Sequence, residues 1–161
     1  ILLKAYKQVS ANPDTWPLVM VGDGPLSKEV LATIKKKDIQ GVQLPGFVSE
    51  SERHRYTREA KWMVTPPHTK EDLGLTPLEA RSVGVPCIAT TDGGIKETAG
   101  INALLCKPGD INALAECLTM AMQMEDAQYE ERSRLAKKDL EQYVRSLDEY
   151  ADEYQKLLNQ E

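Results

Sequence analysis

The sequence predicts an α/β fold in which a mostly parallel sheet is covered by helices on both faces. Apolar runs of four to six residues alternate along the chain with segments whose apolar residues recur at helical spacing. This alternation is typical of repeated strand–helix–strand units, which build parallel sheets. With 161 residues, 41% of them hydrophobic, the chain has enough apolar material for one core.

The predicted elements follow one another in a regular order after an opening helical pattern in which Leu2, Tyr6 and Val9 share one face. The predicted strands are "LVMVG" (18–22), "VQLPGF" (42–47), "WMVT" (62–65), "VPCIAT" (85–90) and "NALLC" (102–106). Helices are predicted within "DGPLSKEVLATIKKK" (23–37), "SESERHRYTREA" (49–60), "PLEARSVG" (77–84), "GGIKETA" (93–99) and "DINALAECLTMAMQM" (110–124). Ser49 or Ser51 is the expected N-cap of the second of these helices, and Asp110 that of the last.

The C-terminal part of the chain has a different pattern. Residues 126–161 hold ten acidic and six basic residues, and apolar residues recur there in steps of three and four from Leu140 to Leu158. This stripe predicts a long amphipathic helix with an acidic outer face. We therefore divide the chain into a Rossmann-like domain, 1–125, and a helical extension, 126–161. The stripe is expected to contact another domain or to support self-association.

Composition excludes several classes of function. No Lys/Arg-rich stripe is present and the net charge is −5, which argues against nucleic acid as a partner. No apolar run approaches the roughly 20 residues of a membrane span, and no signal peptide is recognisable. Three scattered cysteines indicate a reducing, cytoplasmic compartment, with Cys87 and Cys106 as small core residues. The two histidines are too far from the cysteines in sequence to suggest a zinc site.

The segment "VGDGP" joins the first predicted strand to its helix. Gly22 and Gly24 there could bring backbone amides to a phosphate at the helix N-terminus. The third glycine of a dinucleotide motif is replaced by Ser27, and no Gly-Lys-Ser/Thr of a P-loop follows. A tight strand-to-helix turn explains the same residues, and both interpretations stay open.

The segment "KEDLGLTPLEARSVGVP" (70–86) carries Glu71 and Glu79, eight positions apart. Thr76 and Glu79 fit a capping box, with Pro77 at the first helical position. No comparable helix-capping role accounts for Glu71. If Gly74, Leu75 and Thr76 open the helix, their N–H groups face an anion, and the two carboxylates beside it suit hydroxyl groups. A nucleotide sugar has that combination of an anion and hydroxyls.

Four segments in this order carry a resemblance to a known family. The chain over roughly Ile1 to Met122 resembles the nucleotide-binding, C-terminal half of retaining GT-B glycosyltransferases. It is most similar to the large family of bacterial hexosyltransferases that act on glycans and lipid-linked sugars, whose signature is Glu-x7-Glu. The segments are "LVMVGDGP", "VQLPGFVSESERHRYTREA", "PPHTKEDLGLTPLEARSVGVPCIATTDGGIKETAG" and "LLCKPGD".

The resemblance implies roles for individual residues. Glu79 is expected to bind the ribose hydroxyls of the donor, and Glu71 to position the donor sugar as the catalytic-site carboxylate, without acting as a covalent nucleophile. Backbone amides of 74–76 are expected to hold the diphosphate. The remaining donor-binding residues are the cleft-lining Gly22 and Gly24 and the base-contacting loop Gly46, Phe47 and Val48.

The resemblance also implies a reaction. The expected activity is transfer of a hexose from a UDP-sugar, with retention, to a glycan or lipid-linked sugar in polysaccharide biosynthesis, at the inner face of the membrane or in the cytoplasm. Since no Asp-x-Asp occurs, neither a metal nor a cofactor is expected.

Two departures from the family qualify this expectation. Leu73 stands where the family commonly has phenylalanine. The central strand and the basic residues that neutralise the leaving diphosphate would precede Ile1, as would the acceptor-binding N-terminal domain. This chain alone is therefore expected to bind nucleotide without efficient transfer. The alternatives are a GT-B epimerase or phosphorylase and a non-catalytic nucleotide-binding or interaction module.

Overall fold

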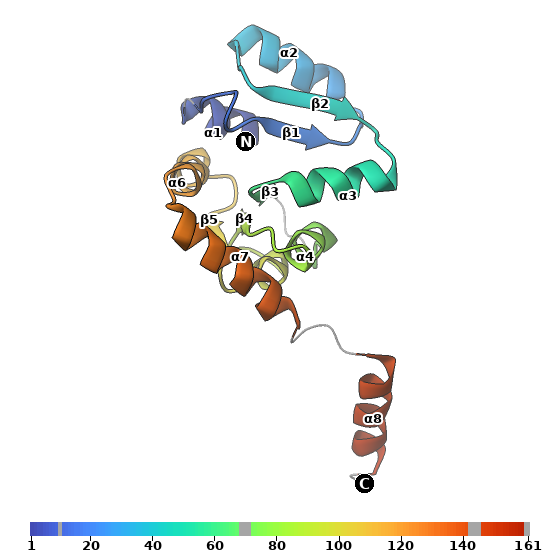
Figure 1. Ribbon diagram of the computed structural model, residues 1–161. Helices are drawn as coiled ribbons and strands as arrows, with labels where there is room; N and C mark the ends of the chain where they lie inside the picture. The colour runs from blue at the N-terminus through green and yellow to red at the C-terminus, as the bar shows by residue number, and fades with distance from the viewer. Residues whose placement is uncertain (10, 68–71, 142–145, 160–161) are drawn as a thin grey trace.

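The computed structural model describes residues 1–9, 11–67, 72–141 and 146–159 (Figure 1). Strands and helices alternate along residues 1–122, as the sequence predicts, and further helices follow. The strands are β1 (Leu18–Val21), β2 (Val42–Gly46), β3 (Met63–Thr65), β4 (Cys87–Thr90) and β5 (Leu104–Cys106). The helices are α1 (Leu2–Gln8), α2 (Ser27–Lys37), α3 (Glu50–Glu59), α4 (Leu75–Ser82), α5 (Ile95–Ala99), α6 (Ile111–Met122), α7 (Asp126–Glu141) and α8 (Leu147–Leu158).

The strands of the described residues form two parallel sheets. β1 pairs with β2, and β3, β4 and β5 pair in that order. β1 and β3 are not paired, so the single sheet expected from the sequence is divided between them.

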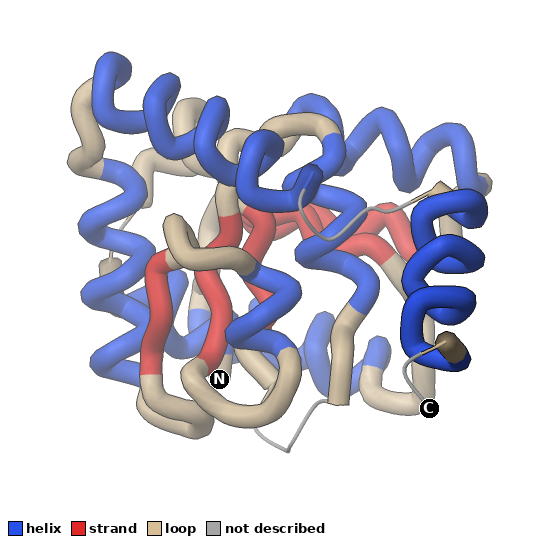
Figure 2. Tube along the Cα trace, turned by 90° about the horizontal axis from the view of Figure 1, so that it is seen from below, coloured by secondary structure: helices blue, strands red, loops and turns tan. Residues whose placement is uncertain are grey.

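Helices cover both faces of the three-stranded sheet (Figure 2). All residues of β4 are buried, and successive side chains point to opposite faces of a strand. Ile88 lies in an apolar cluster with residues of α1, β5 and α6, including Tyr6, Cys106 and Leu114. Cys87 lies in a second cluster with residues of α4 and α5. The prediction that Cys87 and Cys106 are core residues is confirmed.

The N-caps of α3 and α6 stabilise the start of each helix. Ser49 accepts a hydrogen bond from the backbone N–H of Glu52, and the Glu52 carboxylate accepts one from Ser49, which completes a capping box. Asp110 accepts a 3.0 Å hydrogen bond from the N–H of Ala113. Both helices therefore begin at predicted N-caps, and both follow the carboxyl end of a strand.

The C-terminal stripe belongs to two helices, which corrects the expectation of one helix through Leu140–Leu158. Ser146 is extended, with φ −67° and ψ 160°, and caps α8 through a second capping box. Leu140, on α7, is buried, whereas every described residue of α8 is exposed. In Figure 1, α8 stands away from the rest of the chain. Tyr143 and Val144 of the stripe lie outside the described residues.

None of the helices that the structure describes is long and apolar enough to cross a membrane.

Candidate functional site

A cavity of about 450 Å³ lies where β3 ends and α4 begins. It combines apolar walls with backbone amides at a helix N-terminus. The Thr65 side-chain oxygen is buried without a hydrogen-bond partner among the described residues. The lining residues are Thr65, Pro66, Pro67, Gly74, Leu75, Thr76, Pro77 and Ile95. The structure thus brings three predicted site residues, Gly74, Leu75 and Thr76, to one cavity.

Helix α4 begins two residues earlier than expected, and the predicted capping box at Thr76 is wrong. Gly74 is the N-cap, with φ 69°, and no side chain caps the helix. Pro77 falls in the first turn, where its missing N–H removes no intrahelical hydrogen bond. The backbone N–H groups of Leu75 and Thr76 lie in this uncapped turn. They are the donors that an anion in the cavity would meet.

The chain just before α4 is held in place by α5. Thr98 Oγ1 donates a 2.7 Å hydrogen bond to the backbone oxygen of Leu73. The backbone at Gly94 approaches so closely that a Cβ there would lie 1.8 Å from the oxygen of Asp72. The Asp92–Gly94 loop therefore packs against the segment that leads into α4, and this close packing requires glycine at position 94.

Gly22, Gly24 and Gly46 lie at the carboxyl ends of β1 and β2. The N–H of Gly22 donates a 2.9 Å hydrogen bond to the oxygen of Gly46, which joins the two loops. The N–H of Gly24 donates to Asp23 at 2.8 Å and to Ser27 at 3.0 Å. Hydrogen bonds from Ser27 and from the Gly24 amide lower the pKa of the Asp23 carboxyl. Because its own turn already uses the Gly24 amide, the structure favours the tight-turn interpretation over a phosphate cradle.

The predicted base-contacting loop continues from Gly46 into α3. Phe47 is 88% exposed, and Val48 is half-buried. Neither lines the cavity at α4. The predicted base-binding loop therefore follows a strand of the two-stranded sheet, whereas the predicted diphosphate-binding turn follows a strand of the three-stranded sheet.

Glu79 forms an ion pair that the sequence did not reveal. Its Oε2 accepts a hydrogen bond from Nη1 of Arg53, in the first turn of α3. The side chains of Glu79 and Arg53 are 38% and 41% exposed, respectively. The hydrogen bond and charge of Glu79 raise the pKa of Arg53. Glu71, the predicted catalytic carboxylate, and the neighbouring His68 lie outside the described residues.

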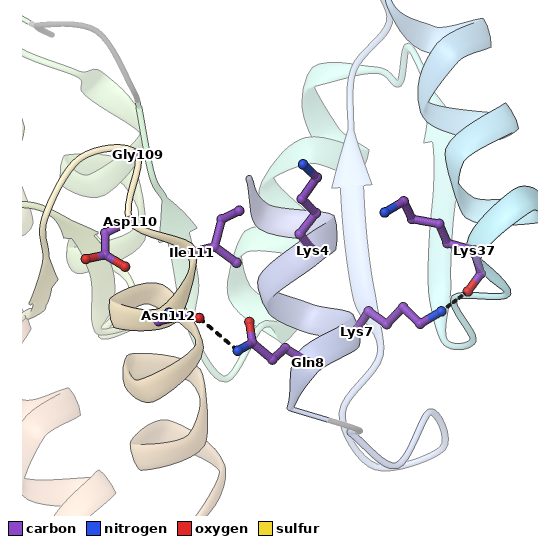
Figure 3. Close-up of a pocket in the computed structure, with 8 residues that line it drawn as sticks. All are labelled: Lys4, Lys7, Gln8, Lys37, Gly109, Asp110, Ile111 and Asn112. Carbon is purple, nitrogen blue, oxygen red and sulfur yellow. Dashed lines mark hydrogen bonds between the residues drawn. The ribbon is translucent and has the colours of Figure 1, made fainter.

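A second cavity, of about 640 Å³, lies between α1 and the start of α6 (Figure 3). Lys4, Lys7 and Lys37 line it, and Lys7 Nζ donates to the backbone oxygen of Lys37. Although larger, it holds none of the predicted site residues. The Asp110 carboxylate already occupies the α6 N-terminus beside it and would repel an anion, so the α4 cavity is the better candidate.

No group of three or more His, Cys, Asp or Glu side chains suited to a metal ion occurs within the described part of the chain. Metal independence stays a prediction, because Glu71 and His68 are not among those residues.

Residues 1–142 match the family described as Glycosyl transferases group 1. A 2-deoxystreptamine N-acetyl-D-glucosaminyltransferase of Niallia circulans is 33% identical over 101 residues, which cover 61% of this chain and 26% of that protein. An N-acetyl-alpha-D-glucosaminyl L-malate synthase of Bacillus anthracis is 31% identical over 117 residues, which cover 71% of this chain and 30% of that protein. The chain thus spans less than a third of either relative.

Solved structures share the fold at lower sequence identity. TarM superposes with a TM-score of 0.76 and 20% identity, over 98% of this chain and 32% of that protein. HepE of Anabaena, in a complex with UDP-glucose, gives a TM-score of 0.68 and 19% identity, over 86% and 40%. The fold is that of GT-B glycosyltransferases. Together with the match over residues 1–142, these findings show that the chain belongs to the group 1 glycosyl transferases.

Proposed function

We propose that this chain is the donor-binding domain of a retaining glycosyltransferase that transfers a hexose from a UDP-sugar. The observation that carries the proposal is the uncapped first turn of α4, which opens into a cavity and has Glu79 one turn further along the helix. Backbone N–H groups suit a diphosphate, and a carboxylate suits sugar or ribose hydroxyls.

The chemistry assigned to each group follows from charge. The amides of Leu75 and Thr76 bind the diphosphate, the Glu79 carboxylate accepts hydrogen bonds from the ribose, and Glu71 positions the hexose. The main demand of the reaction is stabilisation of the diphosphate as it leaves. Since no Lys or Arg is among the described residues that line the cavity, this chain alone binds the donor without efficient transfer. Efficient transfer requires cations from another segment.

The named relatives support the choice of donor. One similar structure is a complex with UDP-glucose, and one similar protein is named as an N-acetyl-D-glucosaminyltransferase. We therefore propose a UDP-hexose as the donor. The acceptor is a glycan or a lipid-linked sugar, held by a separate N-terminal domain. The lack of cations along the described cavity wall equally favours a second candidate, a nucleotide-binding module without transfer activity.

We also propose that α8 is a contact surface. Its exposed apolar residues form one face of the helix: Leu147 is 87% exposed, Tyr154 69% and Leu158 75%. In the complete protein that face packs on the acceptor-binding domain. In the 161-residue chain alone, we expect a second copy to cover it.

Calorimetric titration with UDP, GDP and ADP tests the donor proposal. The chain is expected to bind UDP more tightly than GDP or ADP, and Glu79→Gln is expected to weaken UDP binding about tenfold, as for a lost hydrogen bond to a charged group. Glu116→Gln, an exposed carboxylate on α6, is the matched control and should bind like the wild type. Equal affinity of the wild type and Glu79→Gln would contradict the assigned role of Glu79.

A further inference from the structure

Arg53 and Glu79 connect the two parts of the proposed donor site. The loop that starts at Gly46 ends at Ser49, the N-cap of α3. Arg53 lies four residues after Ser49, in the first turn of that helix. Glu79 lies four residues after Leu75, which lines the α4 cavity. Their ion pair therefore links α3, the helix that follows the predicted base-binding loop, to α4, the helix that carries the predicted ribose ligand.

Helix spacing places Glu79 near the cavity at the start of α4, although Glu79 does not line that cavity itself. Residues four apart lie on the same face of a helix, so Glu79 shares a face with Leu75. Helical side chains also lean toward the N-terminus of their helix, which here is the end that opens into the cavity. Glu79 is thus placed to reach a ligand whose diphosphate occupies the first turn.

The ion pair uses one carboxylate oxygen. Oε2 accepts the hydrogen bond from Arg53, and Oε1 has no hydrogen-bond partner among the described residues. A glutamate without such a partner samples several rotamers, and a ligand must then fix its conformation on binding. Arg53 holds the carboxylate in one orientation through Oε2, which leaves Oε1 to accept a hydrogen bond from a hydroxyl.

Stability alone does not explain this pair. Both side chains are more than a third exposed, and ion pairs at such positions contribute little to the free energy of unfolding. The same chain contains a contrasting case in Arg81, which is 0% exposed and forms a buried pair with Asp139. A half-exposed pair at the edge of a candidate site is better explained by orientation of a ligand-binding group.

We propose that Arg53 is a positioning residue for Glu79 and thereby sets the selectivity of the site for a nucleotide with intact ribose hydroxyls. This inference rests on the proposed function, because Glu79 must contact the ribose for its orientation to matter. Arg53 itself need not touch the ligand.

The test compares the affinity of the 161-residue chain for UDP, 2′-deoxy-UDP and 3′-deoxy-UDP by calorimetry. The wild type should prefer UDP over at least one deoxy analogue by about tenfold. Glu79→Gln should abolish that preference, and Arg53→Met should reduce it to about threefold or less. Arg53→Lys should restore part of it, since it keeps the charge but not the planar fork. Arg55→Met, on the same helix and paired with Glu59, is the control and should keep the full preference.

Each outcome separates the two proposals. If the wild type binds no UDP, or if Glu79→Gln keeps the preference, the proposed function fails and the role of Arg53 fails with it. If Glu79→Gln loses the preference while Arg53→Met keeps it, the donor site stands and the positioning role is overturned. If Arg53→Met weakens all three ligands equally, Arg53 acts on the fold or on the phosphates, and the positioning role is again overturned.

Discussion

Arg81 and Asp139 form a buried ion pair, with Nη2 and Oδ2 2.6 Å apart, that joins α4 to α7. Arg81 also donates to the backbone oxygen of Thr98 at 2.8 Å. Removing one partner of a buried pair leaves the other charge without compensation. We expect Asp139→Ala to lower the free energy of unfolding by about 3–5 kcal/mol, measured by urea denaturation.

The control for this prediction lies on the same helix. Glu131 and Arg134 form an exposed ion pair on α7. Glu131→Ala should leave the urea midpoint close to that of the wild type, because exposed pairs contribute little. Equal effects of the two substitutions would mean that the Arg81–Asp139 pair does not anchor α7.

Gly94 is expected to tolerate no side chain. Its φ of −75° suits any residue, but an added Cβ would lie 1.8 Å from the backbone oxygen of Asp72. Gly94→Ala must therefore displace the chain ahead of α4, with a loss of about 1–3 kcal/mol of stability. Thermal unfolding measures this loss. Gly24→Ala is the matched control, because a Cβ added at Gly24 would meet no atom within 4 Å, and its melting temperature should hardly change.

The stability of the chain should fall at alkaline pH through Cys87. Burial raises the pKa of its thiol from 9.0 to about 12, an effect that the nearby Arg81 partly opposes. Above pH 9.0 the unfolded chain releases the thiol proton, whereas the folded chain keeps it. The contribution to stability is complete below pH 9.0 and is lost as the pH rises toward about 12.

The free energy of unfolding should fall by about 1.4 kcal/mol per pH unit between pH 9.0 and about 12. Urea unfolding of the wild type and Cys87→Ala, at about pH 8 and about pH 10.5, measures it. Between these two pH values the free energy of unfolding of the wild type should fall by about 2 kcal/mol more than that of Cys87→Ala. The difference reports on Cys87 because the other titrating groups are common to both chains. Parallel losses would show that the Cys87 thiol ionises in the folded chain.

The exposed face of α8 predicts self-association of the isolated chain. Sedimentation equilibrium should reveal a concentration-dependent dimer, since one short helix offers a small interface. Tyr154→Glu should shift the chain to monomer, because it places a charge on the apolar face. Gln155→Glu adds the same charge beside that face and should leave the dimer in place. A wild-type chain that stays monomeric at every concentration would refute this prediction.

The sequence predicted the α/β fold. Its prediction of where each helix begins was right or wrong according to the N-cap that forms. Three Ser/Thr-x-x-Glu patterns occur at Ser49, Thr76 and Ser146. Ser49 and Ser146 form capping boxes, and the second of these divides the C-terminal stripe into two helices. Thr76 does not, because Gly74 with its positive φ starts α4 earlier. The pattern alone could not distinguish these cases, since the start of each helix depends on the preceding backbone.

The candidate site was predicted in part. Residues 74–76 line one cavity because they are contiguous in sequence and open a helix, which periodicity and turn chemistry reveal. Arg53 was missed because its partner lies 26 positions away, on another helix. The hydrogen bond from the Gly24 N–H to Ser27 favours the tight-turn interpretation of that segment. The sequence could not show it because it depends on side-chain placement.

The most direct test of the proposed donor site is an amide NMR titration of the chain with UDP. The largest shifts are expected at the N–H groups of Leu75 and Thr76, with smaller ones along the loop from Gly46 to Val48. The N–H groups of Ile111 and Asn112, beside the lysine-lined cavity, should not move. Shifts confined to those residues, or no shifts at all, would contradict the assignment of nucleotide binding to the first turn of α4.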